Sequence, residues 1–338
     1  MKILALLSLC VTLAGLLPPA AAQGHPNKPI RLVVGYSPGG AADVVARVLV
    51  NHLQVQLGQT VQVDNRPGAG ATLAAEIVAR APADGYTLLL GTAALFGLDQ
   101  HLYKVRYTPA DFTPINLAAR SPLILAVSKN LGPRAVAELR AHAKANPGKL
   151  NYAHAGFGAA PHVAGIDFGK AVGVPMTDVP YKGGAPALQA VAAGDVQLSF
   201  GIAASVLPLG QQGLVRMPGV TSLQRSSVAP DLLPLAEQGL PGFEHDFWFG
   251  LFGPAKLPLE VRDKLFAATT RAANDPAVKA GLQVGGNEAQ GSRTPAEFGD
   301  FARASGRASL ERAVQAGVKL ELGAAEFAAF LADGNLPC

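Results

Sequence analysis

The segment from residue 30 to residue 90 alternates short apolar runs with amphipathic stretches, and this order constrains the fold more than any other feature. Two amphipathic helices are expected, one that follows Gly40 and one at 71–80. Buried strands are predicted on either side of them, at 30–34, 60–63 and 86–90. Because βαβ units join parallel strands through a helix, this segment predicts a parallel sheet with helices on both faces.

A second unit of the same kind follows between residues 122 and 200. Its expected strands and helices alternate in the same way, at 122–127, 135–145, 150–153, 162–172, 186–193 and 196–200. A strand predicted at 247–252 returns the chain to the first unit, and the residues from Leu259 onward are mostly helical in pattern.

The chain of 338 residues has room for two medium domains. We therefore expect an α/β fold of two lobes, each a mainly parallel sheet flanked by helices. The first lobe comprises 23–122 plus 247–338, and the second comprises 123–246. Since the chain crosses between the lobes twice, the cleft between them can close by hinging near 120–124 and 246–249.

The N-terminus carries an export signal. Lys2 supplies the positive start, 3–17 the apolar core, and Ala20-Ala21-Ala22 the cleavage site, so residues 1–22 are expected to be removed. Cys10 leaves with this signal, and Cys338 then remains as the single cysteine, which excludes an intramolecular disulfide. Lipid attachment at Cys10 is the alternative that this stretch leaves open.

Composition argues against a nucleic-acid partner. Hydrophobic residues make up 49% of the chain and charged residues 15%, and the net charge is only +4. No run of Lys and Arg interleaved with aromatics occurs, whereas nucleic-acid surfaces are built from such patches. No later segment has the length of apolar sequence that a transmembrane helix needs.

Residues 35–39, Gly-Tyr-Ser-Pro-Gly, match the sequence pattern of the nucleophile elbow found in hydrolases. In such an elbow the backbone N–H of the residue after the serine helps to form the oxyanion hole, and Pro38 has none. Only one strand precedes Ser37, whereas a hydrolase needs a substantial sheet there. We therefore expect no catalytic residue and no enzyme activity, with an exported hydrolase as the disfavoured alternative.

Cofactor and metal motifs are also incomplete. Gly68 and Gly70 begin a dinucleotide-binding pattern that Leu73 breaks, and the pattern that starts at Gly156 is broken at Pro161. Among the seven histidines, only His154 and His162 bracket a loop, and no acidic residue lies between them. Since zinc needs three or four converging ligands, the sequence predicts no metal site and no cofactor.

Backbone amides offer a different kind of site. The pair Gly39-Gly40 stands between a strand and a helix N-terminus, where N–H groups favour an anion. Ligands of parallel sheets bind beyond the carboxyl ends of the strands, which is where Ser37 and Thr92 fall. Residues 181–184 allow two interpretations. Either the Lys182 cation or the backbone amides of this stretch face the cleft, or the stretch is a solvent-exposed turn. Trp248 is predicted to belong to the core.

A series of ordered segments carries a resemblance to a known family: Tyr-Ser-Pro-Gly-Gly at 36–40 with Asp43 and Arg47, Asn-Arg-Pro-Gly-Ala-Gly at 65–70, Ala-Asp-Gly-Tyr-Thr-Leu at 83–88, the turn through Gly156, Gly158 and His162, Pro-Tyr-Lys-Gly-Gly-Ala-Pro-Ala at 180–187, Pro230-Asp231, 235–243 and 250–252. In these segments the chain resembles the exported solute receptors of tripartite tricarboxylate transporters, the Bug family. The resemblance covers nearly the whole mature chain.

The resemblance implies a periplasmic receptor of the type II binding-protein fold. Such a receptor holds a small organic carboxylate through backbone N–H groups and waters, and it passes the ligand to a membrane permease of two subunits. We expect it to act as a monomer. The ligand contacts carried over, or expected beside them, are Tyr36, Ser37, Gly39, Gly40, Ala41 and Thr92 in one lobe, and Gly156, Phe157, Gly158, Ala159, Ala160, Tyr181 and Gly183 in the other.

The sequence departs from the family pattern in a way that bears on the ligand. Ala159 and Ala160 stand where Ser or Thr is usual, and His154 and Gly201 are also unusual. With two hydroxyls fewer, a second carboxylate would leave buried oxygens unpaired. Because Phe157 and Phe200 are expected nearby, we predict a ligand with one carboxylate and an apolar or aromatic body. A sensor without a transport role, built on the same fold, stays open as an alternative.

Overall fold

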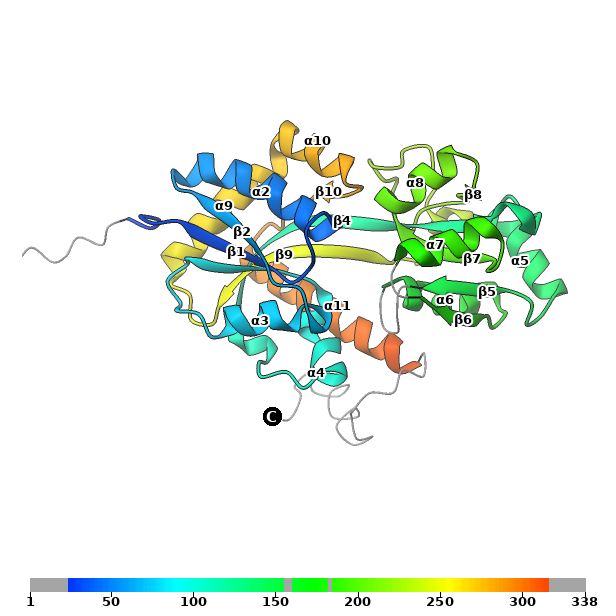
Figure 1. The fold of residues 1–338 in the computed structure, drawn as a ribbon, viewed down its shortest axis with the longest axis horizontal. Coiled ribbons are helices and arrows are strands. Elements are labelled where there is room, and N and C mark those ends of the chain that lie inside the picture. Colours follow the sequence, from blue (N-terminus) through cyan, green and yellow to red (C-terminus); the bar gives the residue numbers. More distant parts are fainter. Residues whose placement is uncertain (1–23, 155–159, 182–183, 316–338) are drawn as a thin grey trace, which may run out of the picture.

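The computed structural model describes residues 24–154, 160–181 and 184–315, which form an elongated molecule around one long twisted sheet (Figure 1). At one end, parallel strands run in the order β2-β1-β3. Their bounds are Ile30–Val34 for β1, Val61–Asn65 for β2 and Thr87–Gly91 for β3. Helices α2 (Ala41–Leu57) and α3 (Thr72–Ala79) connect them, so the first predicted strand–helix series is confirmed. We call this end the first lobe.

The other end, which we call the second lobe, has the parallel order β7-β5-β6. Its strands are β5 (Asn151–His154), β6 (Thr177–Pro180) and β7 (Leu198–Ile202). The helices α5 (Val136–Ala145) and α6 (Ala160–Val172) cover one face, and α7 (Gly184–Ala193) and α8 (Ala203–Gln211) cover the other.

Two long strands join the lobes (Figure 1). They are β4 (Phe112–Ser128) and β9 (Asp246–Pro254), and they run antiparallel because the chain leaves the first lobe on one and returns on the other. The ladder between them ends at the pair Pro122–Asp246, and β4 then pairs with β7 from Leu123 onward. The crossing strands thus make the sheet as a whole mixed. Within each lobe the strands remain mainly parallel, as the sequence predicts. The lobe boundaries themselves stay a prediction.

The first half of β4 is an element that the sequence pattern did not predict. Pro114 and Asn116 interrupt its apolar run, and the register with β9 shifts between these two residues. The fully buried Asn116 side chain donates to Thr269 Oγ1 at 3.0 Å and accepts from Ser292 Oγ at 2.7 Å. These bonds satisfy a polar group that would be costly to bury alone, so an apolar pattern is not required here.

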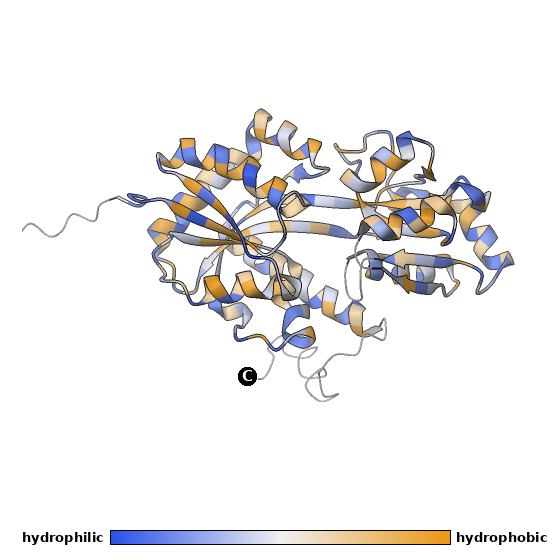
Figure 2. Cartoon of the chain, in the orientation of Figure 1, coloured by the Kyte–Doolittle hydropathy of each residue, from blue (hydrophilic) through white to orange (hydrophobic). Residues whose placement is uncertain are grey.

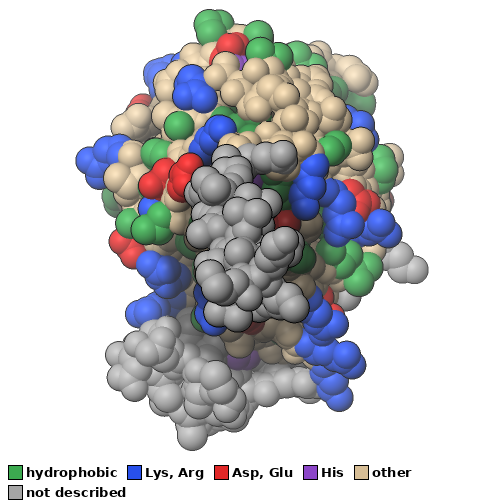
Figure 3. Space-filling model, turned by 90° about the vertical axis from the view of Figure 1, so that its left-hand side faces the viewer, with side chains coloured by type: hydrophobic (Ala, Val, Ile, Leu, Met, Phe, Trp, Pro, Cys, Tyr) green, Lys and Arg blue, Asp and Glu red, His purple; other side chains and the backbone are tan. Residues whose placement is uncertain are grey.

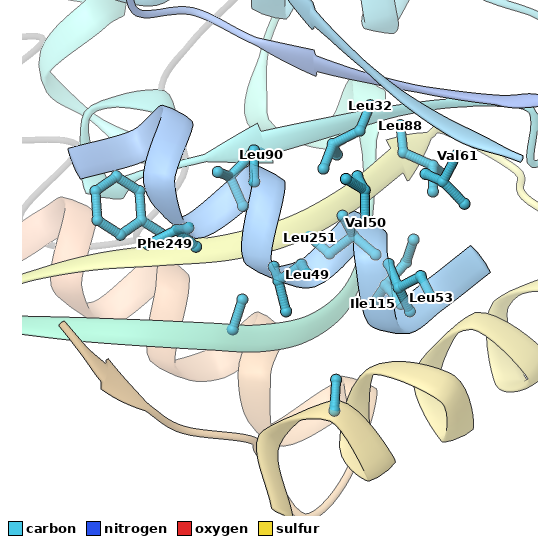
Figure 4. Close-up of a cluster of buried hydrophobic side chains, with 14 of the residues drawn as sticks. Leu32, Leu49, Val50, Leu53, Val61, Leu88, Leu90, Ile115, Phe249 and Leu251 are labelled. Atoms are coloured by element: carbon cyan, nitrogen blue, oxygen red, sulfur yellow. The ribbon is translucent and has the colours of Figure 1, made fainter. Parts of the chain in front are cut away.

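Each lobe has buried clusters on both faces of its sheet. Figure 4 shows one of them, in which side chains of α2 such as Leu49 and Leu53 meet Leu32, Leu90 and Leu251 of the strands. Figure 2 shows apolar residues along the strands and, alternating with polar ones, along the helices beside them. The apolar spacing of the first helix is therefore explained by the sheet it covers.

The C-terminal part of the chain packs back onto the first lobe. It consists of α9 (Leu259–Asn274), α10 (Pro276–Val284), the short strand β10 (Glu288–Ala289) and α11 (Pro295–Gln315). The remaining short α-helix is α4 (Leu98–Leu102) and the remaining short strand is β8 (Val215–Arg216). Within the described ranges, no helix has both the length and the apolar character to cross a membrane.

On the face of the molecule that Figure 3 shows, basic and acidic side chains are interspersed.

The lobes also touch on both sides of the crossing strands. On one side, Arg312 of α11 lies 3.4 Å from Asp167 of α6. On the other, Glu288 Oε1 accepts hydrogen bonds of 2.6 Å from the Ser226 hydroxyl and the Ser227 N–H, both in the loop that precedes β9. The space between the lobes is thus bounded by polar contacts as well as by β4 and β9.

Candidate ligand site

A cavity of about 780 Å³ lies between the two lobes, beside the crossing strands and under α11. Tyr36, Thr92 and Asp99 line it from the first lobe, and Ala160 and Val163 line it from the first turn of α6 in the second. This volume is within the range of small-molecule sites, and both lobes contribute walls. The cavity is therefore the candidate ligand site.

Two of the first-lobe residues follow the carboxyl ends of strands. Tyr36 comes after β1 and Thr92 after β3, and the two side chains are hydrogen-bonded to each other. Burial raises the pKa of Tyr36 to about 12, so its phenol stays protonated at physiological pH. Since open α/β sheets bind ligands at this edge, the structure places two neutral hydroxyl groups where a ligand is expected.

An acidic side chain lies in the same wall. Asp99 is buried in the first turn of α4, and the Tyr107 hydroxyl donates to its Oδ2 at 2.9 Å. Burial raises the pKa of Asp99 to about 7, although the Tyr107 hydrogen bond opposes the shift. Below neutral pH this carboxyl is thus increasingly protonated and uncharged, which reduces its repulsion of an anionic ligand.

The crossing strands contribute a charged pair. Arg120 of β4 lies 3.1 Å from Asp246 of β9 and 3.5 Å from Glu244, and its guanidinium stacks over the Phe301 ring at 4.8 Å. Burial raises the pKa of Asp246, and the attraction of Arg120 offsets this only in part. Arg120 Nε and Asp246 Oδ1 are buried and have no hydrogen-bond partner among the described residues. Arg120 and Asp246 both line the cavity, and these two buried atoms leave their hydrogen-bonding capacity unused beside it.

Aromatic side chains form the wall under α11. Trp248 donates from Nε1 to Ser305 Oγ at 2.8 Å, and its ring lies 5.5 Å from that of Phe301. Trp248 is only 2% exposed, which confirms the prediction that it belongs to the core. Its remaining surface nevertheless lines the cavity with Phe247 and Phe301, so the same side chain serves both purposes.

Arg312 lines the cavity on the side next to α6. Its guanidinium forms an ion pair with Asp167, which also lies 3.4 Å from His245 Nε2. Burial alone would raise the pKa of Asp167, but the His245 hydrogen bond and the charges of His245, Arg312 and Lys170 lower it overall. Burial lowers the pKa of His245. Asp167 is thus an ionised partner that neutralises Arg312.

The N-terminus of α2 differs from the expectation. The Gly39 N–H donates to the carboxylate of Asp43 at 2.9 Å, and Arg47 and Asn65 bond the same carboxylate. The expectation that the Gly39 amide faces an incoming anion is therefore wrong, because an internal anion occupies it. Gly40 is the N-cap and has no capping side chain, so the first turn of α2 keeps the N–H groups that follow it.

The structure brings only part of the predicted contact set to the cavity. Tyr36, Thr92 and Ala160 line it, whereas the lining does not include the other described members of the set, Ser37, Gly39, Gly40, Ala41 and Tyr181. The predicted contacts Gly156, Phe157, Gly158, Ala159 and Gly183 lie outside the described residues.

Phe200 does not line the cavity, contrary to expectation. It is fully buried between Phe168 and Phe243 in the second-lobe core, with ring centroids 5.7 and 5.9 Å away. Phe200 lies on the strand face that α6 covers, so its ring packs in the core. The aromatic surface of the cavity comes instead from Phe247, Trp248 and Phe301.

Sequence reasoning missed the charged lining residues because they belong to no motif. One signal was present, however. Arg120 is the single charged residue of β4, and Asp246 is the single charged residue of β9. An isolated charge in an otherwise uncharged strand needs a partner or a functional reason. Nothing comparable in the sequence pointed to Asp99 or Arg312.

Away from the cavity, two histidines gain an acidic neighbour. His154 ends β5 and His162 lies in the first turn of α6, and Asp178 of β6 lies 3.3 Å from His154 Nε2. Asp178 lies beyond both histidines along the chain, so the residues between them do not indicate it. These three form the one group of potential metal ligands found among the described residues.

Comparison with known proteins agrees with this architecture. Residues 45–294 match the model of the tripartite tricarboxylate transporter family receptor. The chain is 37% identical to the "UPF0065 protein in tcbD-tcbE intergenic region" of a Pseudomonas species, over 77% of this chain and 78% of the relative. It is similar to the R. palustris protein Rpa4515 solved with adipate, with a TM-score of 0.74, 33% identity, and 87% and 98% coverage. It is also similar to the periplasmic binding protein BugD, with a TM-score of 0.70, 32% identity, and 87% and 99% coverage.

Proposed function

Because this chain belongs to the tripartite tricarboxylate transporter receptor family, we propose that it is a periplasmic receptor that binds a small organic carboxylate between its lobes and delivers it to a membrane permease of two subunits. In this proposal residues 1–22 are the export signal, and the mature protein acts as a monomer without catalysis. The relative solved with adipate supports a carboxylate ligand, and the periplasmic relative supports the location.

The observation that carries the proposal is the cavity with walls from both lobes and from the crossing strands. A ligand held there contacts both lobes at once, so it favours an arrangement in which they are close together. Thr92 and Tyr36 line the cavity with hydroxyl-bearing side chains and Arg120 with a guanidinium, and the first turn of α2 adds N–H groups beyond the lining.

The charges of the cavity favour a single carboxylate on the ligand. Arg120 is already paired with Asp246 and Glu244, and Arg312 is paired with Asp167. A second carboxylate on the ligand would compete with these acidic side chains for the same cations. Phe247, Trp248 and Phe301 offer aromatic surface for the rest of the molecule. We therefore keep the sequence-based hypothesis of one carboxylate with an apolar or aromatic body, now on a different set of aromatic residues.

The lobes in this proposal meet at residues 122–123 and 246–247. The antiparallel ladder of β4 and β9 ends there, and β4 changes partner from β9 to β7. Rotation of one lobe against the other would change φ and ψ at a few residues near this point and leave both cores intact. Small-angle scattering checks the rotation, because saturating ligand should reduce the radius of gyration.

Thermal unfolding of protein stripped of endogenous ligand tests the ligand class. Benzoate and nicotinate are compared with adipate, malate, citrate and aspartate at equal concentrations. A ligand at 100 times its Kd stabilises the fold by about 2.7 kcal/mol. We expect the monocarboxylates to give the larger shifts. Larger shifts with the multiply charged acids would overturn the ligand class but keep the receptor, and no shift with any acid would count against the receptor itself.

A further inference from the structure

Two buried histidines and one carboxylate converge in the second lobe, outside the ligand cavity. His154 ends β5, His162 lies in the first turn of α6, and Asp178 is on β6. His154 Nε2 is 3.3 Å from Asp178 Oδ2, and the imidazole centroids of His154 and His162 are 4.3 Å apart. One donor atom from each of the three residues lies within 4.8 Å of the others.

The strand register places these groups on one face of the sheet. In the parallel ladder Tyr152 of β5 is opposite Asp178 of β6, and His154 follows Tyr152 by two residues. Residues two apart on a strand share a face, and so do register partners. Helix α6 covers this face and brings His162 down onto it. Three separate elements thus supply one ligand each.

The surroundings hold the imidazoles in place. The His162 ring stacks on Tyr152 with centroids 6.3 Å apart and an interplanar angle of 25°. Gly165 makes room for this arrangement, because a Cβ there would lie 2.1 Å from Tyr152 Cε2. Both histidines are buried, whereas the Asp178 side chain is 39% exposed. An ion can therefore reach the group from the solvent side of Asp178.

The donor set suits a divalent transition metal. Two imidazoles and one carboxylate are ligands that zinc takes in proteins, with a fourth position left to water. The donor atoms around a tetrahedral ion lie about 3.4 Å apart, so the present spacing of at most 4.8 Å has to contract when an ion binds.

We propose that His154, His162 and Asp178 bind one divalent transition metal ion of the zinc class, which ties β5, β6 and α6 of the second lobe together. The ion is separate from the ligand of the cavity. Ala160 and Val163 of α6 line that cavity, but His162 does not, because it is turned to the sheet. The ion therefore fixes the helix whose opposite side forms a wall of the ligand site.

Zinc titration of the full mature chain tests this proposal. The protein carries no histidine tag, is treated with EDTA and is dialysed before ZnCl₂ is added in a calorimeter. We expect one Zn²⁺ per chain and a higher melting temperature in its presence. His162→Ala and Asp178→Asn should each weaken binding by at least about tenfold. His142→Ala, which removes a histidine of α5 from the same lobe, should leave it unchanged.

Asp178→Asn keeps the proposal testable if a histidine variant unfolds, since Asp178 is partly exposed and the amide has the same shape. Co²⁺ provides a second readout: its visible absorption bands should indicate nitrogen and oxygen ligands in the intact protein and disappear in the Asp178→Asn variant. Absence of zinc uptake would overturn the proposal. So would binding that is equally tight in the His162→Ala and Asp178→Asn variants.

Discussion

The guanidinium of Arg312 lies 3.4 Å from the carboxylate of Asp167, and this pair links α11 of the first lobe to α6 of the second. Both residues adjoin the ligand cavity, Arg312 as a lining residue and Asp167 through His245. The pair therefore stabilises the arrangement of lobes seen here and leaves the core of each lobe alone.

Arg312→Gln should weaken ligand binding without unfolding the protein. The pair is partly exposed, and such pairs contribute about 0.2–1 kcal/mol, so the apparent Kd should rise by about 1.5- to 5-fold. Calorimetry with the best acid of the panel measures this. Arg303→Gln is the matched control, because Arg303 pairs with Asp300 within α11 itself. An equal loss in both variants would contradict a role for the contact between lobes.

Asp99→Asn should change how stability depends on pH. The folded-state pKa of Asp99 is about 7 against 3.8 for the free side chain, so between these values the native state retains a proton that the unfolded state has released. Stability then falls as pH rises through this window, by up to about 4 kcal/mol for this group. Urea unfolding at pH 5, 6, 7 and 8 measures the free energy of unfolding of both proteins. We expect the stability of the variant, relative to that of the natural protein, to increase as pH rises. A constant difference across these pH values would sink the idea, and the exposed Asp300→Asn serves as control.

Thr92→Val should reduce affinity for the carboxylate and spare the fold. The substitution removes one hydroxyl from the cavity wall and leaves the Tyr36 hydroxyl without its partner, at an expected cost of about 1–2 kcal/mol in binding. Calorimetry should show a Kd about 5- to 30-fold higher. Thr177→Val, at an exposed position of β6, should bind as the natural protein does. Unchanged binding in Thr92→Val would place the ligand elsewhere.

Gly40→Asp tests whether the N-terminus of α2 contacts the ligand. Asp is a favourable N-cap, so the variant should fold at least as stably, but its charge opposes a bound carboxylate. We expect affinity to fall by at least about tenfold, and by much less in Gly40→Ala, which adds a side chain without charge. If Gly40→Asp binds normally, the ligand does not approach α2 and the contacts predicted at 37–41 are wrong.

The sequence predicted the sheet better than the site. The strands β1, β2 and β3 and their helices carry regular apolar spacing, and the sheet that imposes this spacing is present where expected. The first half of β4 was missed because Asn116 is satisfied by Thr269 and Ser292, residues far away in the chain. The Gly39 amide was misjudged for a related reason: its partner Asp43 was visible in the sequence, but the direction of its carboxylate was not.

Site residues contributed by the crossing strands could not be read from local patterns. Arg120 and Asp246 meet because β4 and β9 pair, and the lining of the cavity by Asp99 and Arg312 depends on how α4 and α11 pack. The family resemblance, confirmed by the comparisons, predicted the two-lobed fold. It did not predict the charged side chains that line the cavity, since none of the matching motifs contains them.

The two passages between the lobes also set an order of assembly. The second lobe is built from one continuous stretch, and its strands find partners soon after they are made. In the first lobe, β3 has to wait for β9, because Leu89 pairs with Phe252 only after the whole second lobe has been synthesised. Contacts between residues so far apart in the chain form slowly, since a long loop has to close first. We expect the second lobe to fold early and the pairing of β9 with β3 to limit the rate of folding. Until β9 arrives, the edge of β3 is exposed, and it is there that a molecular chaperone would be needed.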